Sequence, residues 1–245
     1  MWKDRRKKPK SKNSKDRRKN MKLRKMVAIF AAAAMVFSLA ACGAKENTIA
    51  ADDGTKKDTE AETMIVDKEN KEITMLCEVN GTYFTEPTRH GIVYAEGSNG
   101  EKAVLRGLAD EKEFYQALLD IGATAGDNLT DEDMKAGPDN GKAVEGDKLN
   151  VFVKWEGQDE IPFADIIKCS EGEYEMDIRF GGNIESAKKH NTGCVLCLDS
   201  CATGITSDAT WPTGTTQNEV AKFYGDDSVL PEDGTQVTVI FRLAE

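Results

Sequence analysis

Residues 72–84 read EITMLCEVNGTYF, and this stretch gives the clearest prediction of the fold. Apolar and polar side chains alternate along its first eight positions, which is the two-residue period of a half-buried β-strand. The pair Asn80-Gly81 follows, and such a pair favours a tight hairpin because both residues tolerate positive φ angles. The sequence therefore predicts a strand that turns at residues 80–81 and returns through residues 82–84. Its inward face would consist of Ile73, Met75, Cys77 and Val79.

The same alternation recurs at residues 149–155 (LNVFVKW), 174–180 (YEMDIRF) and 237–243 (VTVIFRL). One helix is predicted from residue 111, because Asp110 can cap its start and Gly122 can end it. A shorter helix is predicted over residues 184–190, with Asn183 as its cap. Strands outnumber helices, so we expect an α+β fold. It would be a single domain, residues 72–245, with a mainly antiparallel or mixed sheet and few short helices.

The first 41 residues have the parts of a bacterial export signal. Residues 1–25 are rich in Lys and Arg, and residues 26–41 (MVAIFAAAAMVFSLAA) are apolar but shorter than the roughly 20 residues of a membrane span. Residues 39–42 (LAAC) resemble the lipobox of bacterial lipoproteins. We therefore expect residues 1–41 to be removed as a signal peptide and Cys42 to carry a lipid. Because Met21 begins a complete signal by itself, residues 1–20 could come from a mis-called start.

Without the signal, the chain is strongly acidic. The 41 expected signal residues hold 14 of the 33 Lys and Arg but only 2 of the 43 Asp and Glu, so the rest carries a net charge of about −22. Such a surface repels nucleic acid, and the membrane would be contacted through the lipid on Cys42. Residues 42–71 are polar and have few large apolar side chains, so we interpret them as the lipid anchor and a flexible tether.

The chemical signal of the chain is concentrated in residues 193–201, GCVLCLDSC. Cys194, Cys197 and Cys201 have the spacing C-x2-C-x3-C. Three thiolates this close need a cation or oxidation to coexist, and a soft metal ion such as zinc or an iron–sulfur cluster would meet that need. The candidates for a further ligand are Cys169, His190 and Cys77.

Oxidation is the alternative, because C-x2-C also suits a dithiol couple in which Cys201 is a third, resolving thiol. An oxidising compartment outside the cytoplasm favours disulfides. The number of cysteines does not decide between the two interpretations, since two disulfides and a four-cysteine metal site each leave one of five thiols over.

Motifs typical of enzymes are missing from the sequence. It contains no G-x-G-x-x-G, Walker loop, G-x-S-x-G or H-E-x-x-H, which favours a non-enzymatic protein without excluding a reaction. His90 follows a proline within PTRHG and is interpreted as a surface residue of a turn. The acidic stretch 127–133 lacks the glycine and the terminal glutamate of an EF-hand and is interpreted as a solvated loop.

Several stretches together resemble the YdjY-type domain of bacterial lipoproteins and periplasmic proteins: residues 72–84, 89–123, 148–157 and 193–215. The resemblance covers most of residues 72–245, although relatives tend to carry a proline near Thr124 or Ala125 and this chain has none. Members with the GC-x-x-C segment are often labelled ferredoxin-like, which implies an iron–sulfur role by analogy. The family offers no established reaction to carry over.

These observations predict a lipoprotein that is anchored to the cell membrane and faces outside the cytoplasm. Its domain would hold a cysteine-ligated metal or iron–sulfur site and serve electron transfer with a redox partner protein. The alternative is a non-catalytic binding module in which the cysteines form structural disulfides.

Overall fold

The computed structural model describes residues 62–135 and 137–245. The expected signal peptide, Cys42 and most of the expected tether therefore lie outside the described residues. Over the part that is described, no helix combines the length and the apolar character needed to span a bilayer.

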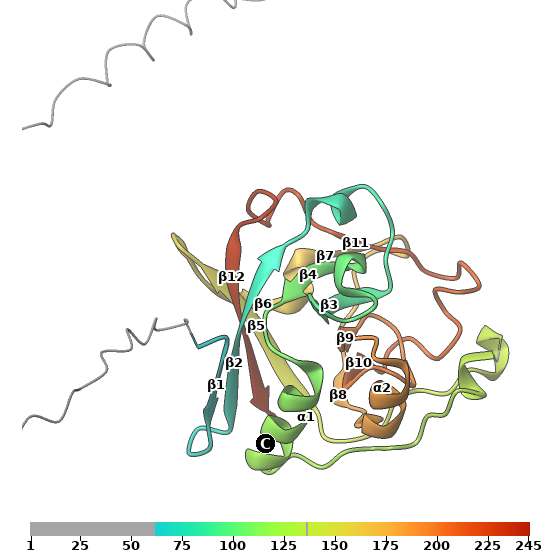
Figure 1. Cartoon of the computed structure of the whole chain (residues 1–245). Coiled ribbons are helices and arrows are strands. Elements are labelled where there is room, and N and C mark those ends of the chain that lie inside the picture. Colours follow the sequence, from blue (N-terminus) through green and yellow to red (C-terminus); the bar gives the residue numbers. More distant parts are fainter. Residues whose placement is uncertain (1–61, 136) are drawn as a thin grey trace, which may run out of the picture. The chain divides into compact units, whose positions relative to one another are not determined.

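One curled, mixed β-sheet dominates the domain (Figure 1). Its ten strands follow the spatial order β6-β5-β12-β2-β4-β3-β9-β10-β8, and β1 pairs with β2 outside this path. The pairs β3/β4 and β9/β10 are parallel, and the other pairs are antiparallel. A separate two-stranded sheet joins β7 and β11. The prediction of a single domain with a mixed sheet is confirmed.

The strands are β1 (Met64–Asp67), β2 (Glu72–Val79), β3 (His90–Tyr94), β4 (Ala103–Gly107), β5 (Leu149–Trp155), β6 (Gln158–Pro162), β7 (Ile167–Cys169), β8 (Ile178–Phe180), β9 (Cys194–Cys197), β10 (Thr206–Asp208), β11 (Phe223–Gly225) and β12 (Gln236–Leu243). The described residues also contain two α-helices, α1 (Glu111–Asp120) and α2 (Ile184–His190), and short 3-10 helices. Few helices were expected, and both lie at the predicted positions.

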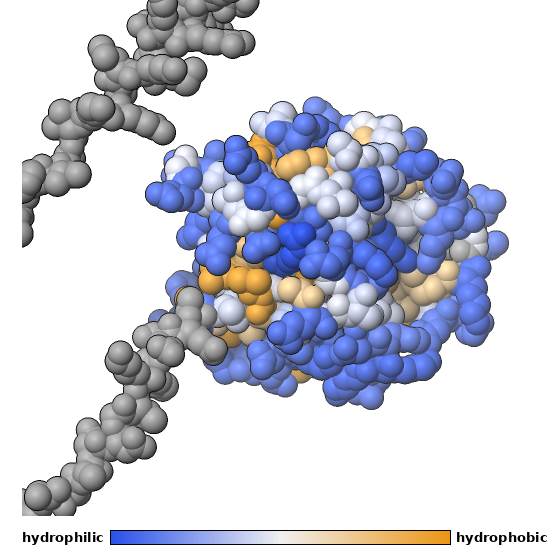
Figure 2. Space-filling view, turned by 45° about the horizontal axis from the view of Figure 1, so that its top comes forward, coloured by the Kyte–Doolittle hydropathy of each residue, from blue (hydrophilic) through white to orange (hydrophobic). Residues whose placement is uncertain are grey.

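The core forms where α1 packs on the sheet. Phe114 of α1 contacts Phe241 of β12 with 4.6 Å between the ring centroids, and Tyr115 contacts Phe180 of β8 at 5.5 Å. The predicted inward face of β2 is confirmed, because its four apolar side chains are fully buried. The outer surface is mostly hydrophilic on the face that Figure 2 shows, as the acidic composition predicts.

The predicted hairpin at Asn80-Gly81 is wrong. Residues Gly81–Phe84 form a 3-10 helix, and β2 pairs instead with β12, β4 and β1. The reason lies in Asn80, whose φ of −110° is not the positive value that a tight hairpin needs. Its side chain accepts from the Thr82 amide and donates to the Glu101 carbonyl, so Asn80 is a buried connector.

Two further boundaries differ from the prediction. The sheet begins at Met64, because β1 pairs with β2 from Met64↔Met75 to Asp67↔Glu72, so the domain starts before residue 72. In the stretch 174–180, strand geometry is limited to β8. Asn183 precedes α2 as predicted, but its side chain makes no cap hydrogen bond. It donates instead to the carbonyls of Cys201 and Gly204.

Candidate metal centre

The C-x2-C pair lies on β9, a fully buried strand between β3 and β10. Side chains three residues apart in a regular strand point to opposite faces. The pairing of β9 with β3 is irregular, however. Val195 is an extra residue between the pairs Val93↔Cys194 and Ile92↔Leu196, and Gly91 is an extra residue on β3. An extra residue reverses the alternation, so both thiols of the pair can lie on the same face of the sheet.

His90, at the start of β3, completes this group. Its Nδ1 lies 3.6 Å from Cys194 Sγ and 4.0 Å from Cys197 Sγ. The three ligand atoms all lie within 4.8 Å of one another, and His90 is half-buried while both cysteines are fully buried. In the part of the chain that the structure describes, this is the one such group of histidine, cysteine and carboxylate side chains.

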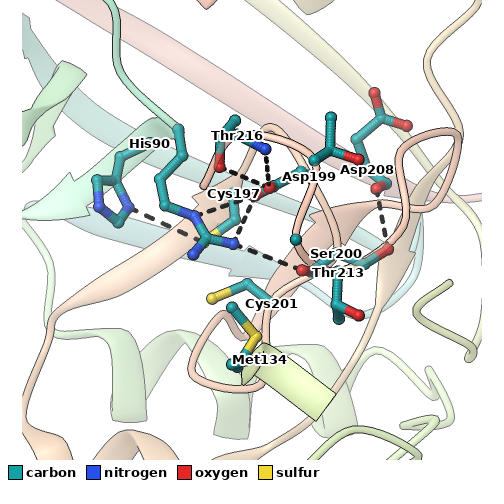
Figure 3. Close-up of polar contacts among 12 residues, drawn as sticks. His90, Met134, Cys197, Asp199, Ser200, Cys201, Asp208, Thr213 and Thr216 are labelled. Atoms are coloured by element: carbon teal, nitrogen blue, oxygen red, sulfur yellow. Dashed lines mark hydrogen bonds and ion pairs between the residues drawn. The ribbon is translucent and has the colours of Figure 1, made fainter. Parts of the chain in front are cut away.

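Cys201 lies in the loop between β9 and β10 and packs against Cys194 and Cys197. Asn183 holds this loop through its two hydrogen bonds of 3.1 Å to the Cys201 and Gly204 carbonyls. The backbone of Gly204 packs close to Cys197, because a Cβ at this position would lie 3.0 Å from Cys197 Sγ. Figure 3 shows His90 facing the Cys197 side chain, with Cys201 and Met134 next to each other below it.

A buried ion pair lies beside the sulfur atoms. Arg89 Nη2 donates to Asp199 Oδ1 at 2.6 Å and Nε donates to the same oxygen at 3.0 Å. Asp199 is fully buried and also accepts from the amide and the hydroxyl of Thr216. These contacts fix Arg89 in place. Burial opposes the charge of Arg89, but the negative charges of Cys201, Asp199 and Cys197 outweigh it and raise the arginine pKa.

The three thiols do not ionise alike. A hydrogen bond from Cys197 and the neighbouring His90 lower the pKa of Cys194 well below its ordinary value, although burial acts the other way. A hydrogen bond from Cys197 and the charge of Arg89 lower the pKa of Cys201 to about 6, again against burial. The pKa of Cys197, which supplies both hydrogen bonds, is raised. The lowered pKa values of Cys194 and Cys201 favour their thiolate forms, the form of cysteine that binds metals.

The other predicted ligands lie elsewhere. Cys169 is on β7 in the small sheet, and Cys77 is buried in the main core. His190, at the end of α2, contacts the Asp131 carboxylate at 3.1 Å instead of the cysteines. The structure thus brings together Cys194, Cys197 and Cys201, and it adds His90 in place of the predicted fourth ligands. All five described cysteines are free thiols, so the disulfides of the alternative interpretation are not present.

The spacing of these atoms suits a single metal ion. In a tetrahedral site with metal–sulfur bonds of about 2.3 Å and metal–nitrogen bonds of about 2.0 Å, nitrogen and sulfur ligands lie about 3.5 Å apart. The two His90–cysteine distances are 3.6 and 4.0 Å. Side chains that bind different irons of a cluster lie farther apart than this, so the spacing favours one ion over a 4Fe–4S cluster. Two thiolates and an imidazole are ligands for zinc, copper or iron.

The YdjY domain family model matches residues 64–242. The chain belongs to the YdjY family. It is 40% identical over 214 residues to the "Uncharacterized protein YdjY" of Escherichia coli (strain K12), and the match covers 86% of this chain and 91% of that protein. No solved structure matches the chain. The YdjY domain model begins at Met64, the first residue of β1, which agrees with the start of the sheet.

Proposed function

We propose that this protein is a lipid-anchored, extracytoplasmic metalloprotein whose YdjY domain holds one thiophilic metal ion and serves electron transfer. One observation carries the proposal: His90, Cys194 and Cys197 place an imidazole nitrogen and two buried sulfurs within 4.8 Å of one another. Cys194 and Cys201, whose pKa values are lowered, pack against Cys197, and buried thiolates this close need a cation to offset their repulsion. The adjacent Arg89 is paired with Asp199.

The burial of the centre supports electron transfer rather than action on a substrate. Cys194 and Cys197 have no exposed surface and Cys201 is 3% exposed, so these sulfurs do not form an open surface on which a substrate could bind. A redox-active ion bound there would accept and release one electron. The imidazole of His90 is the half-buried edge of the site and would face a redox partner protein, while the apolar Val93 and Ala103 pack with the cysteines and help to exclude water.

Residues 39–42 (LAAC) and the preceding apolar run support the location. A lipid on Cys42 would hold the acidic domain at the membrane surface, outside the cytoplasm, with residues 43–61 as the tether. The strongly acidic domain would then attract a redox partner with a basic surface, because complementary charge accelerates association.

The test is metal analysis of the full chain purified in detergent without oxygen, combined with alkylation of free thiols. The proposal expects about one copper or iron ion per chain, and thiols that react only after the metal is removed. The matched control is Cys77→Ala, because Cys77 lies in a different cluster of the core. Stoichiometric zinc would preserve the metal site but contradict electron transfer. A disulfide between Cys194 and Cys197 with no bound metal would contradict the proposal and favour the redox or binding-module interpretation.

A further inference from the structure

Met134 is the partly buried side chain that packs against the sulfur cluster. It lies in the 3-10 helix Asp133–Lys135, within a polar segment next to the β9–β10 loop. The neighbouring side chains of that helix, Asp133 and Lys135, make polar contacts instead. Met134 packs against two buried clusters: one consists of Val93, Ala103, Cys194, Cys197 and Cys201, and the other of Leu129, Val144 and Ala202.

The sulfur of Met134 is fixed toward the cysteine loop. Its Sδ accepts a hydrogen bond of 3.2 Å from the amide of Ala202, the residue after Cys201. A thioether sulfur has a second lone pair, which remains available. Two ion pairs fix the segment that carries Met134. Lys142 Nζ contacts Asp133 at 2.7 Å, and Lys189 Nζ contacts Asp131 at 2.7 Å.

We propose that Met134 supplies a thioether ligand at the metal centre and that the ion bound there is monovalent copper. This inference rests on the proposed metal centre and names its ion. Thioether sulfur is a soft, uncharged ligand that favours Cu(I), whereas the usual ligands of Zn²⁺ are thiolate, imidazole and carboxylate. The cysteines and the imidazole suit either ion, so the added thioether is the ligand that favours Cu(I) over Zn²⁺.

The experiment compares Cu(I) and Zn²⁺ affinities of the full chain, each measured by competition with a chromophoric chelator without oxygen. Met134→Leu removes the sulfur and keeps most of the volume. The expected result is a loss of Cu(I) affinity of at least about tenfold, with Zn²⁺ affinity changed by less than about twofold. Met176→Leu is the matched control, because Met176 packs on the main core, and it should change neither affinity.

Equal Cu(I) affinity in the wild type and Met134→Leu would overturn the inference while leaving the metal centre intact. A wild type that binds Zn²⁺ more tightly than Cu(I) would also overturn the inference. A wild type that binds neither ion would overturn the proposed function itself, so the two failures are distinguishable.

A second measurement decides the matter if Met134→Leu does not fold. Wild-type protein labelled with selenomethionine and loaded with Cu(I) can be examined by X-ray absorption at the copper edge. Selenium bonded to copper would support the inference. A copper spectrum that contains sulfur and nitrogen neighbours but no selenium neighbour would overturn it.

Discussion

The two histidines of the chain have different surroundings, and this difference is testable residue by residue. His90 lies against two buried thiols, whereas His190 is exposed and contacts Asp131. His90→Ala should lower metal affinity by at least about 100-fold, because loss of a partner outside the ligand shell already costs 10–100-fold. His190→Ala should leave the affinity within about twofold. Competition with a chelator measures both, and similar losses in the two variants would contradict the assignment of His90.

Asp208, on β10, carries a buried charge whose effect depends on pH. Burial raises its pKa above the ordinary 3.8, although hydrogen bonds from the amides of Thr210 and Asp177 act in the opposite direction. The folded state therefore binds more protons than the unfolded chain between 3.8 and the raised value, so the free energy of unfolding falls as pH rises through that window. Above this pH window, burying the charged carboxylate lowers the free energy of unfolding by its full amount.

Asp208→Asn keeps an oxygen acceptor for both amides and removes this charge. We expect it to increase the free energy of unfolding at pH 7 by about 1 kcal/mol, which is roughly 2–4 °C in Tm. The gain should disappear at about pH 2.5, more than one unit below 3.8, where both the folded and the unfolded carboxyl are protonated. Thermal unfolding at the two pH values measures this, and a variant that is destabilised at pH 7 would contradict the account.

Sequence reasoning found the three clustered cysteines but not His90. The residues around His90, PTRHG, have the composition of a turn, and nothing local shows that a strand begins there. His90 and Cys194 are 104 positions apart and meet only because β3 pairs with β9. A candidate ligand that is supplied by long-range strand pairing leaves no spacing pattern, whereas His190 was favoured only by its closeness in sequence.

Among the elements, those with a strong local pattern were predicted well. Strands β2, β5 and β12 follow their alternation, and α1 follows its capping residues. The irregular pairing of β9 was not predictable, because an extra residue in a strand depends on the partner strand. In a regular strand Cys194 and Cys197 would lie on opposite faces, while the irregular pairing allows them to lie together, as their clustering in the sequence predicts.

The start of α1 provides a direct test at this scale. Asp110 accepts a hydrogen bond of 2.7 Å from the Lys112 amide and so satisfies one of the free donors at the helix end. Asp110→Ala should lower the free energy of unfolding by about 1 kcal/mol. Asp110→Asn is the control, because it keeps a capping oxygen and should stay within about 0.5 kcal/mol of the wild type. Urea unfolding measures both, and equal losses would contradict the capping role.

For the whole molecule, the anchor and the tether make one joint prediction. Cys42→Ala should leave the protein unprocessed or release it from the membrane fraction, since no lipid could attach. Brief proteolysis should cut first within residues 43–61 and leave a fragment that begins near Met64, where β1 joins the sheet. Fractionation and intact mass measure these outcomes. A mature chain with an unmodified Cys42, or a first cut inside the sheet, would contradict them.

The central claim is that one metal ion is bound by His90, Cys194 and Cys197. X-ray absorption of the protein purified without oxygen tests it most directly, because the spectrum counts the neighbours of the metal. The account predicts a histidine nitrogen and at least two sulfur neighbours, the sulfurs at about 2.3 Å, with no second metal nearby. A spectrum with metal–metal scattering, or a protein purified without oxygen that contains no metal, would contradict it.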